Sequence, residues 1–222
     1  IGKGLLLASL VMCLSACTSK DEREAHYLQL GKSLLEQNHL DQAVAQFHNV
    51  LQLNAANVEA YYQLGLIQET RQQYRAAQEY FTRALEREPD HAQAQVRLAR
   101  MHLMLGQSPQ ATANASALLK ADPANISAKT VLAQVNGQQG NLGKAADDLE
   151  KAKKSGSNPV EFYQELASLY LRRGELSKAQ TILVEAIKYH PQNVTLQTGL
   201  AQAYLQGGNA EKAETPLLAA IA

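Results

Sequence analysis

The sequence predicts an all-α protein in which antiparallel helix pairs stack into a solenoid, and three observations predict it. Leucines stand 34 residues apart at six positions: Leu30, Leu64, Leu98, Leu132, Leu166 and Leu200. An alanine follows each leucine after 13 residues: Ala43, Ala77, Ala111, Ala145, Ala179 and Ala213. Between the two stands a glycine or a side-chain amide: Asn38, Gln72, Gly106, Gly140, Gly174 and Gly208. A fixed period of this length is the signature of a repeat array.

Residues 1–16 differ in composition from everything that follows. Lys3 precedes an apolar stretch from Leu5 to Leu14. This stretch is shorter than the roughly 20 apolar residues that a membrane-spanning helix needs. Its length and its positive head match the hydrophobic region of a secretory signal. We therefore expect residues 1–16 to be a signal peptide.

The signal ends in Leu14-Ser15-Ala16-Cys17, which resembles the bacterial lipobox. The resemblance implies a lipoprotein whose Cys17 thiol takes the diacylglyceryl group and then carries several acyl chains, palmitate among them. Thr18 follows instead of Asp, which favours the outer membrane, on its periplasmic side. Residues 17–23 are then a short polar tether. The alternatives are a signal anchor, or an ordinary secretory signal cleaved elsewhere.

After the tether, the period sets the boundaries of the repeats without any insertion. They are predicted at 24–57, 58–91, 92–125, 126–159, 160–193 and 194–222, the last being incomplete. Position 8 of each repeat is small, which lets the two helices of a pair approach closely: Gly31, Gly65, Ala99, Ala133, Ala167 and Ala201. We expect the periodic alanines, at position 20, to pack against it. Position 24 fills the next layer with Phe47, Phe81, Ala115, Leu149, Leu183 and Leu217.

The predicted turns carry residues suited to them. The glycine or amide residue at position 15 favours the left-handed backbone that closes a helix. Proline ends the second helix at Pro89, Pro123 and Pro191. Asn54, Asp90, Asp122 and Asn193 stand nearby and are predicted to cap the following helices.

These positions resemble the tetratricopeptide repeat, a 34-residue helix–turn–helix unit. The resemblance implies a right-handed superhelix of antiparallel helix pairs. Position 4 follows the pattern at Tyr27, Tyr61 and Tyr163, but departs from it at Gln95, Lys129 and Gln197, where we expect looser packing. Pro216 lies in the last helix and should bend it. The uncapped apolar end favours a longer array, with dimerisation through that end as the alternative.

The resemblance implies that positions 2, 5, 9, 12 and 13 of each first helix line a concave groove. In the first three repeats we expect a protein-binding groove formed by Leu28, Lys32, Leu35, Glu36, Tyr62, Leu66, Glu69, Val96, Arg100, Leu103 and Met104. Its mixture of apolar and charged residues suits an amphipathic peptide or helix. The later repeats are polar there: Thr130, Gln134, Gln138, Gln164, Ser168, Arg172, Thr198, Gln202 and Gln206. Alternatively, several of these residues contact only the neighbouring repeat.

Composition and spacing argue against other classes of function. Lys plus Arg and Asp plus Glu balance at 21 each, which gives no electrostatic reason to expect nucleic acid. Both cysteines lie in the first 17 residues, so the repeats contain no thiol nucleophile. No two histidines stand four residues apart, and Gly31-Lys32-Ser33 lacks the rest of a phosphate-binding loop. We expect no catalytic site, metal, cofactor or small-molecule substrate.

A lipobox followed by tetratricopeptide repeats resembles two groups of bacterial lipoproteins. One group is associated with exopolysaccharide export and the PEP-CTERM sorting system, and the other consists of pilotins for type IV pilus secretins. We favour the first group, and hence a lipid-anchored scaffold that helps to assemble an envelope export machine. The remaining alternatives are an N-terminal module of a longer enzyme and a spacer without a defined ligand.

Overall fold

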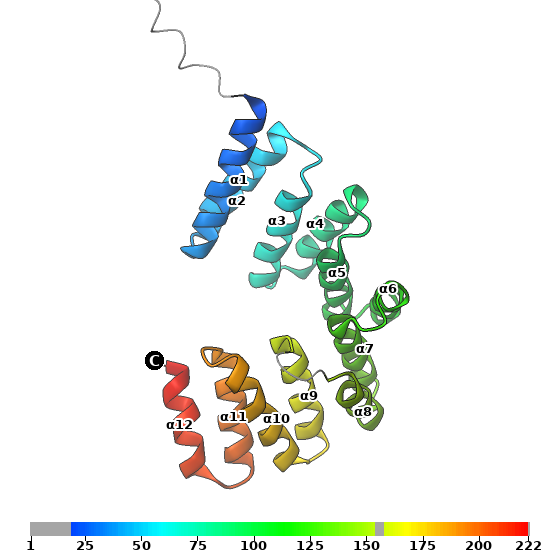
Figure 1. The fold of residues 1–222 in the computed structure, drawn as a ribbon, viewed down its shortest axis with the longest axis vertical. Helices are drawn as coiled ribbons and strands as arrows, with labels where there is room; N and C mark the ends of the chain where they lie inside the picture. Colours follow the sequence, from blue (N-terminus) through cyan, green and yellow to red (C-terminus); the bar gives the residue numbers. More distant parts are fainter. Residues whose placement is uncertain (1–18, 154–157, 222) are drawn as a thin grey trace, which may run out of the picture. The chain divides into compact units, whose positions relative to one another are not determined.

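A computed structural model describes residues 19–153 and 158–221 of the chain (Figure 1). Within these residues there are twelve α-helices and no strand, which confirms the predicted all-α repeat fold. The helices are α1 (Lys20–Glu36), α2 (Leu40–Leu53), α3 (Val58–Thr70), α4 (Tyr74–Arg87), α5 (Ala92–Met104), α6 (Ser108–Ala121), α7 (Ile126–Gln138), α8 (Leu142–Ala152), α9 (Val160–Arg172), α10 (Leu176–Tyr189), α11 (Val194–Gln206) and α12 (Ala210–Ile221).

The chain divides into two compact units, a division that the regular period did not predict. The first unit covers residues 1–89 and contains α1–α4, and the second covers residues 90–222 and contains α5–α12. Within each unit, consecutive helices form antiparallel pairs (Figure 1), and in the second unit the successive first helices α5, α7, α9 and α11 are in contact.

The turn inside each helix pair has the predicted left-handed residue. The backbone angle φ is +59° at Asn38 and +58° at Gln72, and it lies between +72° and +86° at Gly106, Gly140, Gly174 and Gly208. Asparagine and glutamine adopt this conformation less readily than glycine. The prediction from position 15 is confirmed in all six turns.

The periodic alanines and leucines are buried to different extents. All six alanines are at most 1% exposed. Of the leucines, Leu64, Leu166 and Leu200 are buried and Leu98 and Leu132 are half-buried, whereas Leu30 is 37% exposed. Leu30 is therefore the exposed member of this set.

The two glycines at position 8 lie closest to the phenylalanine at position 24, and the expected packing against the alanine at position 20 stays a prediction. A Cβ atom added to Gly31 would lie 2.7 Å from Cε1 of Phe47, and one added to Gly65 would lie 2.5 Å from Cε1 of Phe81. The later repeats carry alanine at position 8 and alanine or leucine at position 24. Glycine is therefore paired with the large ring in the first unit.

Helix α1 begins inside the segment predicted as a tether. Ser19 and Glu22 form a capping box: Ser19 Oγ accepts from the Glu22 N–H at 3.1 Å, and the Ser19 N–H donates to Glu22 Oε2 at 2.7 Å. Residues 20–23 are thus helical. The pattern Ser-x-x-Glu was visible in the sequence, and it corrects the predicted tether of residues 17–23.

Three of the four predicted helix caps are wrong. Only Asn193 caps as expected, with Oδ1 accepting from the Leu196 N–H at 3.0 Å. The other three helices are capped one or three residues later, by Asn57, His91 and Asn125. Asn54 and Asp122 instead accept from the N–H two residues ahead, which makes a turn that delays the start of the next helix.

Position 4 of the last repeat is buried although glutamine replaces tyrosine there. The amide of Gln197, which is 7% exposed, donates to the Pro191 carbonyl at 3.1 Å. The Tyr61 hydroxyl makes the equivalent bond to the carbonyl of Ala55 at 3.2 Å. The looser packing expected at Gln197 is therefore wrong, since glutamine reaches the same acceptor.

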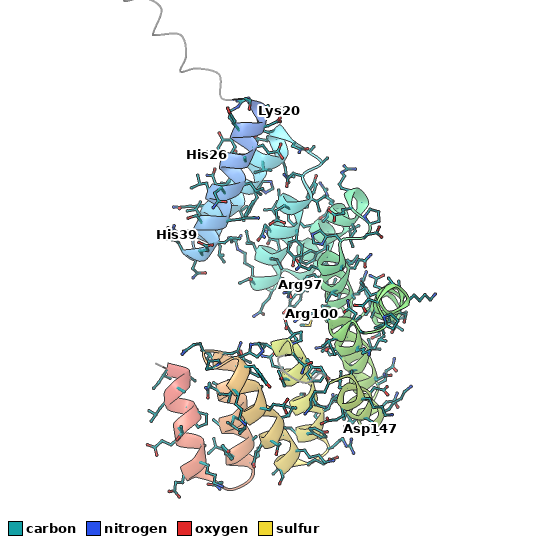
Figure 2. All side chains as sticks on the ribbon, in the orientation of Figure 1. Lys20, His26, His39, Arg97, Arg100 and Asp147 are labelled. Carbon is teal, nitrogen blue, oxygen red and sulfur yellow. The ribbon has the colours of Figure 1, made fainter. Side chains whose placement is uncertain are left out.

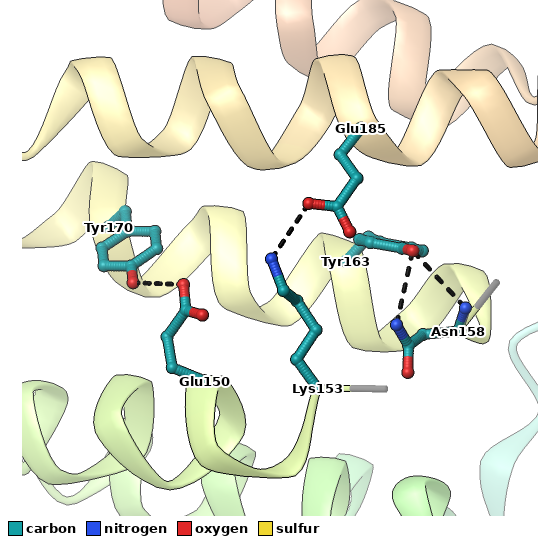
Figure 3. Close-up of polar contacts among 6 residues, drawn as sticks. All are labelled: Glu150, Lys153, Asn158, Tyr163, Tyr170 and Glu185. Carbon is teal, nitrogen blue, oxygen red and sulfur yellow. Dashed lines mark hydrogen bonds and ion pairs between the residues drawn. The ribbon is translucent and has the colours of Figure 1, made fainter. Parts of the chain in front are cut away.

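The junction of α8, α9 and α10 is held by polar contacts (Figure 3). The Tyr163 hydroxyl accepts from the backbone and side-chain N–H groups of Asn158, both at 3.4 Å. Lys153 Nζ pairs with Glu185 Oε2 at 3.0 Å, and the Tyr170 hydroxyl donates to Glu150 Oε1 at 2.7 Å. These contacts join the core of the second unit on both sides of residues 154–157.

Helix α12 has an open apolar face. Leu217 at position 24 is 43% exposed, whereas Leu149 and Leu183 at the same position are buried. Leu218 and Ile221 are also exposed. Pro216 is buried inside the helix, and the bend that we expect there stays a prediction, as do the longer array and the dimer.

Candidate functional site

A cavity of about 530 Å³ lies among α9, α10 and α11 in the second unit. This volume is within the range of about 300–1,000 Å³ typical of binding pockets. The first helices α9 and α11 supply most of its wall, and α10 supplies one leucine. It is lined by Gln164, Ala167, Ser168, Leu171, Arg172, Leu183, Thr195, Gly199, Gln202 and Gln206.

The apolar part of the cavity rests on the repeat core. Ala167 and Leu183 are 3% and 2% exposed, and Leu171 is half-buried beside them. Gly199 on α11 faces Leu183: a Cβ atom added to Gly199 would lie 3.6 Å and 3.9 Å from the two Cδ atoms. These are ordinary van der Waals distances, so the neighbours leave room for a side chain that glycine does not provide.

The polar part of the cavity is rich in side-chain amides. Gln164, Gln202 and Gln206 each carry a donor and an acceptor, and Ser168 and Thr195 carry hydroxyls. The one charged lining residue is Arg172, whose Nη2 donates to the carbonyl oxygen of Gly137 at 2.7 Å. The cavity thus offers many hydrogen bonds and little net charge.

Two glutamates on α9 flank this surface on the side of α5 and α7. Arg100 and Arg97 both come from α5 (Figure 2), and Arg100 Nη1 pairs with Glu161 Oε1 at 2.9 Å. Burial acts to raise the pKa of the Glu161 carboxyl, but a backbone hydrogen bond and the two arginines hold it below the usual value. The pair joins α5 to α9, which are separated in the sequence by α6, α7 and α8.

Glu165, four residues later on α9, has the opposite shift. Burial raises the pKa of its carboxyl, although a hydrogen bond with Gln134 and the charge of Arg172 act to lower it. On α7, Thr130 is 4% exposed, and its hydroxyl donates to the Ile126 carbonyl at 2.9 Å. Thr130 was expected on the polar surface of the groove, and the structure corrects this.

The first unit has a separate cavity of about 470 Å³ between the second helices α2 and α4. His48, Tyr61, Tyr80 and Arg83 line it together with Leu51, Gln52 and Glu79. The Arg83 guanidinium lies 3.4 Å from the Glu79 carboxylate. This cavity lies away from the first-helix face on which the groove was predicted.

Two residues predicted to line the groove belong to the core. Tyr62 is 8% exposed and packs against Phe81 with 5.8 Å between the ring centroids. Leu103 is 5% exposed and lies in a cluster with Ala111, Ala115 and Val131. Neither offers surface to a partner, so the expectation is corrected for these two side chains.

The other predicted groove residues keep that role only as a prediction. Lys32 Nζ pairs with Glu59 Oε1 at 2.6 Å within the first unit, so its charge is already matched. Met104 is 54% exposed on α5. The rest are half-buried or exposed: Leu28, Leu35, Glu36, Leu66, Glu69, Val96 and Arg100. Cys17, the predicted lipidation site, lies outside the described residues.

No helix of residues 19–153 and 158–221 combines the length and the apolar character needed to cross a bilayer. The same residues contain no group of three His, Cys, Asp or Glu side chains placed to hold a metal ion.

The sequence did not predict the cavity on the first helices α9 and α11. The groove predicted on the first three repeats stays a prediction. The missed signal was Gly199 at position 6, where the other repeats carry Gln29, Gln63, Arg97, Val131 and Glu165.

Comparisons with known families identify the repeats. A family profile described as the C-terminal ARM domain of tetratricopeptide repeat protein 21 matches residues 7–136, and a tetratricopeptide-repeat profile matches residues 165–222. No curated protein matches the sequence.

Solved structures share the fold at low sequence identity. TTC0263, a thermophilic TPR protein in Thermus thermophilus, is 24% identical and has a TM-score of 0.71, over 82% of this chain and 99% of that one. PilW, described as a widely conserved type IV pilus biogenesis factor, is 20% identical with a TM-score of 0.67, over 87% and 90%. YrrB, described as a TPR protein with an unusual peptide-binding site, is 18% identical with a TM-score of 0.54, over 80% and 92%.

Proposed function

Because this chain belongs to the tetratricopeptide-repeat proteins, we propose that it is a protein-binding scaffold tethered to a bacterial envelope membrane through lipidated Cys17. The observation that carries the binding role is the cavity on the first helices α9 and α11, with its amide-rich wall and apolar floor. Stacked repeats display such a surface without any catalytic group. The scaffold is non-enzymatic.

The tether rests on the sequence Leu14-Ser15-Ala16-Cys17 after an apolar stretch. Two or more acyl chains hold a protein stably at a membrane, whereas one does so only marginally. A lipidated Cys17 would lie two residues before the Ser19 cap of α1, so the array would begin close to the membrane surface. We place it at the outer membrane, facing the periplasm, because Thr18 follows the cysteine.

The machine served by the scaffold is an envelope export system. The lipobox followed by repeats favours the systems that export exopolysaccharide or sort PEP-CTERM proteins. A second candidate is assembly of a type IV pilus secretin, favoured by the likeness to PilW over 87% of this chain. An N-terminal module of a longer enzyme is the remaining alternative.

Replacing the anchoring thiol tests the tether. In cells fed labelled palmitate, the unmodified chain should carry label and sediment with membranes. The Cys17→Ser variant should lose both properties. Unchanged membrane sedimentation of Cys17→Ser would contradict the lipid anchor. It would not affect the proposed binding role of the repeats.

Photocrosslinking in cells tests the binding role. A photoreactive amino acid replaces Gln206, which lines the cavity, or the exposed Asp147 on α8, which does not (Figure 2). We expect a discrete crosslinked protein from position 206 and none from position 147. Identification of an export or a pilus component then decides between the two machines. Equal yields at both positions, or none at either, would refute the scaffold.

A further inference from the structure

The lining of the cavity in the second unit includes one glycine, Gly199. At position 6 of the other repeats stand glutamine, arginine, valine or glutamate, and only the last repeat has glycine, Gly199. A glycine within a helix costs about 1 kcal/mol relative to alanine. Neither the packing nor the backbone requires this glycine, because a Cβ atom would lie 3.6 Å from Leu183 and φ is not positive.

Six other glycines have a clear structural reason, whereas Gly143 on α8, like Gly199, has open space beside it. Gly31 and Gly65 leave room for phenylalanine rings that approach the Cβ position to 2.7 Å and 2.5 Å. Gly106, Gly140, Gly174 and Gly208 adopt positive φ. Gly199 has neither reason, and the space that it leaves is part of the cavity.

The chemistry around that space restricts the ligand. The floor is aliphatic, formed by Ala167, Leu171 and Leu183. The rim carries carboxamides and hydroxyls, which can pair with the N–H and C=O groups of a peptide backbone. Arg172 is the only charge, and it already donates to the Gly137 carbonyl at 2.7 Å. A charged side chain would find no counter-ion on the floor and would lose its hydration.

We infer that this cavity binds an extended, uncharged peptide segment of the partner, with one aliphatic side chain inserted beside Gly199 and the flanking backbone bonded to the amide rim. The inference rests on the proposed scaffold role, and it specifies the chemistry of the recognised segment. Gly199 is a specificity-determining residue, since any larger side chain at this position fills the space that the ligand needs.

Selection from a random dodecapeptide library displayed on phage tests this inference, with the full chain in mild detergent as the target. We expect the enriched peptides to share an aliphatic residue between uncharged neighbours. Their affinity should change by less than about twofold between 0.05 and 0.5 M salt, because uncharged contacts are not screened.

A filled variant and a matched control show where the peptides bind. Gly199→Leu should weaken the enriched peptides by at least about tenfold, because the aliphatic anchor loses its buried site. Gly143→Leu makes the same exchange on α8, where an added Cβ would have its nearest neighbour, Arg173 Nη1, 4.0 Å away. This control should bind as the unmodified chain does. Circular dichroism and urea unfolding confirm that both variants fold.

Three outcomes would overturn the inference. They are enrichment of charged peptides whose binding weakens with salt, equal binding to the Gly199→Leu variant, and no enrichment at all. The crosslinking experiment is independent of these results. If position 206 captures a partner but the enriched peptides are charged, the proposed scaffold role is supported and the proposed binding of an uncharged segment is refuted.

Discussion

Two glycines in first helices of the repeats differ in whether a neighbouring side chain fills the space beside them. Gly65 is at position 8 of its repeat and Gly199 is at position 6. At Gly65 in α3, the space where a side chain would be is taken by Phe81, whose Cε1 would lie 2.5 Å from an added Cβ. At Gly199 in α11, the nearest atom would be 3.6 Å away, and the space is open to a cavity. Packing therefore requires a glycine at position 65, but it does not require one at position 199.

This difference predicts that substitutions at the two glycines affect different properties, stability in one case and binding in the other. Where the chain fills the space beside its own glycine, substitution there changes the free energy of unfolding. Where the space stays open, substitution should change binding and leave the fold intact. The four predictions below follow this contrast, from the largest expected effect to the smallest.

Removing a ring from a filled position should have the largest effect. Phe81 is fully buried, and Phe81→Ala should lower the free energy of unfolding by about 3–5 kcal/mol, because a cavity remains beside Gly65. Urea unfolding followed by circular dichroism measures this loss. Leu217 stands at the same position of the last repeat but is 43% exposed, so Leu217→Ala should change the value by only about 0.5 kcal/mol. Equal losses in the two variants would contradict the contrast.

Adding a methyl group at the filled glycine should also destabilise. Gly65→Ala should lower the free energy of unfolding by about 1–3 kcal/mol, since the ring of Phe81 must shift. Phe81→Leu in the same chain should restore most of this loss, because Ala133 with Leu149 and Ala167 with Leu183 show that combination in other repeats. A double-mutant cycle without coupling between the two positions would refute the pairing.

The ion pair of Arg100 on α5 with Glu161 on α9 contains a titratable carboxyl, that of Glu161. The pKa of Glu161 is depressed, so the pair adds stability that is present above the unfolded-state pKa and is lost as pH falls through the folded-state value, below 4.5. Arg100→Ala should therefore cost about 1 kcal/mol or less at neutral pH and less still in acid. Unfolding in urea across pH 3–7 measures both. A loss that grows on acidification would contradict the pair.

Filling the open site by one carbon should make the protein more stable. Gly199→Ala should raise the free energy of unfolding by about 0.5–1 kcal/mol, because alanine favours the helix and meets no close atom. Thermal and urea unfolding of the two chains give the value. A destabilised Gly199→Ala variant would mean that packing requires this glycine, as it requires Gly65.

The fold was predictable because its rules are local and recur in each repeat. Gly106 and Asn38 mark turns through backbone conformation alone, and the alanines are buried in every repeat. The exceptions are Leu30 in α1 and Leu217 in α12, which are exposed although other residues at the same repeat positions are buried.

The site was less predictable because side-chain exposure depends on how successive pairs pack. Leu103 has a groove position in the register, yet it packs with Ala111 and Val131 in the core. The pairing of Arg100 with Glu161, 61 residues apart, follows from the proximity of α5 and α9, which sequence spacing alone does not give. Gly199 stands at a position where the residue type varies between repeats, so the sequence alone did not indicate its role. Its place in the cavity lining is seen only in the structure.

The crosslinking yield from position 206 in cells, with and without Gly199→Leu, tests the central claim most directly. We predict that the partner is captured when position 199 is glycine and is lost in the Gly199→Leu variant, at equal amounts of folded protein. The Gly143→Leu control should capture the partner as well as the unmodified chain does. An undiminished yield in Gly199→Leu would contradict the claim that the open glycine of α11 forms the binding site.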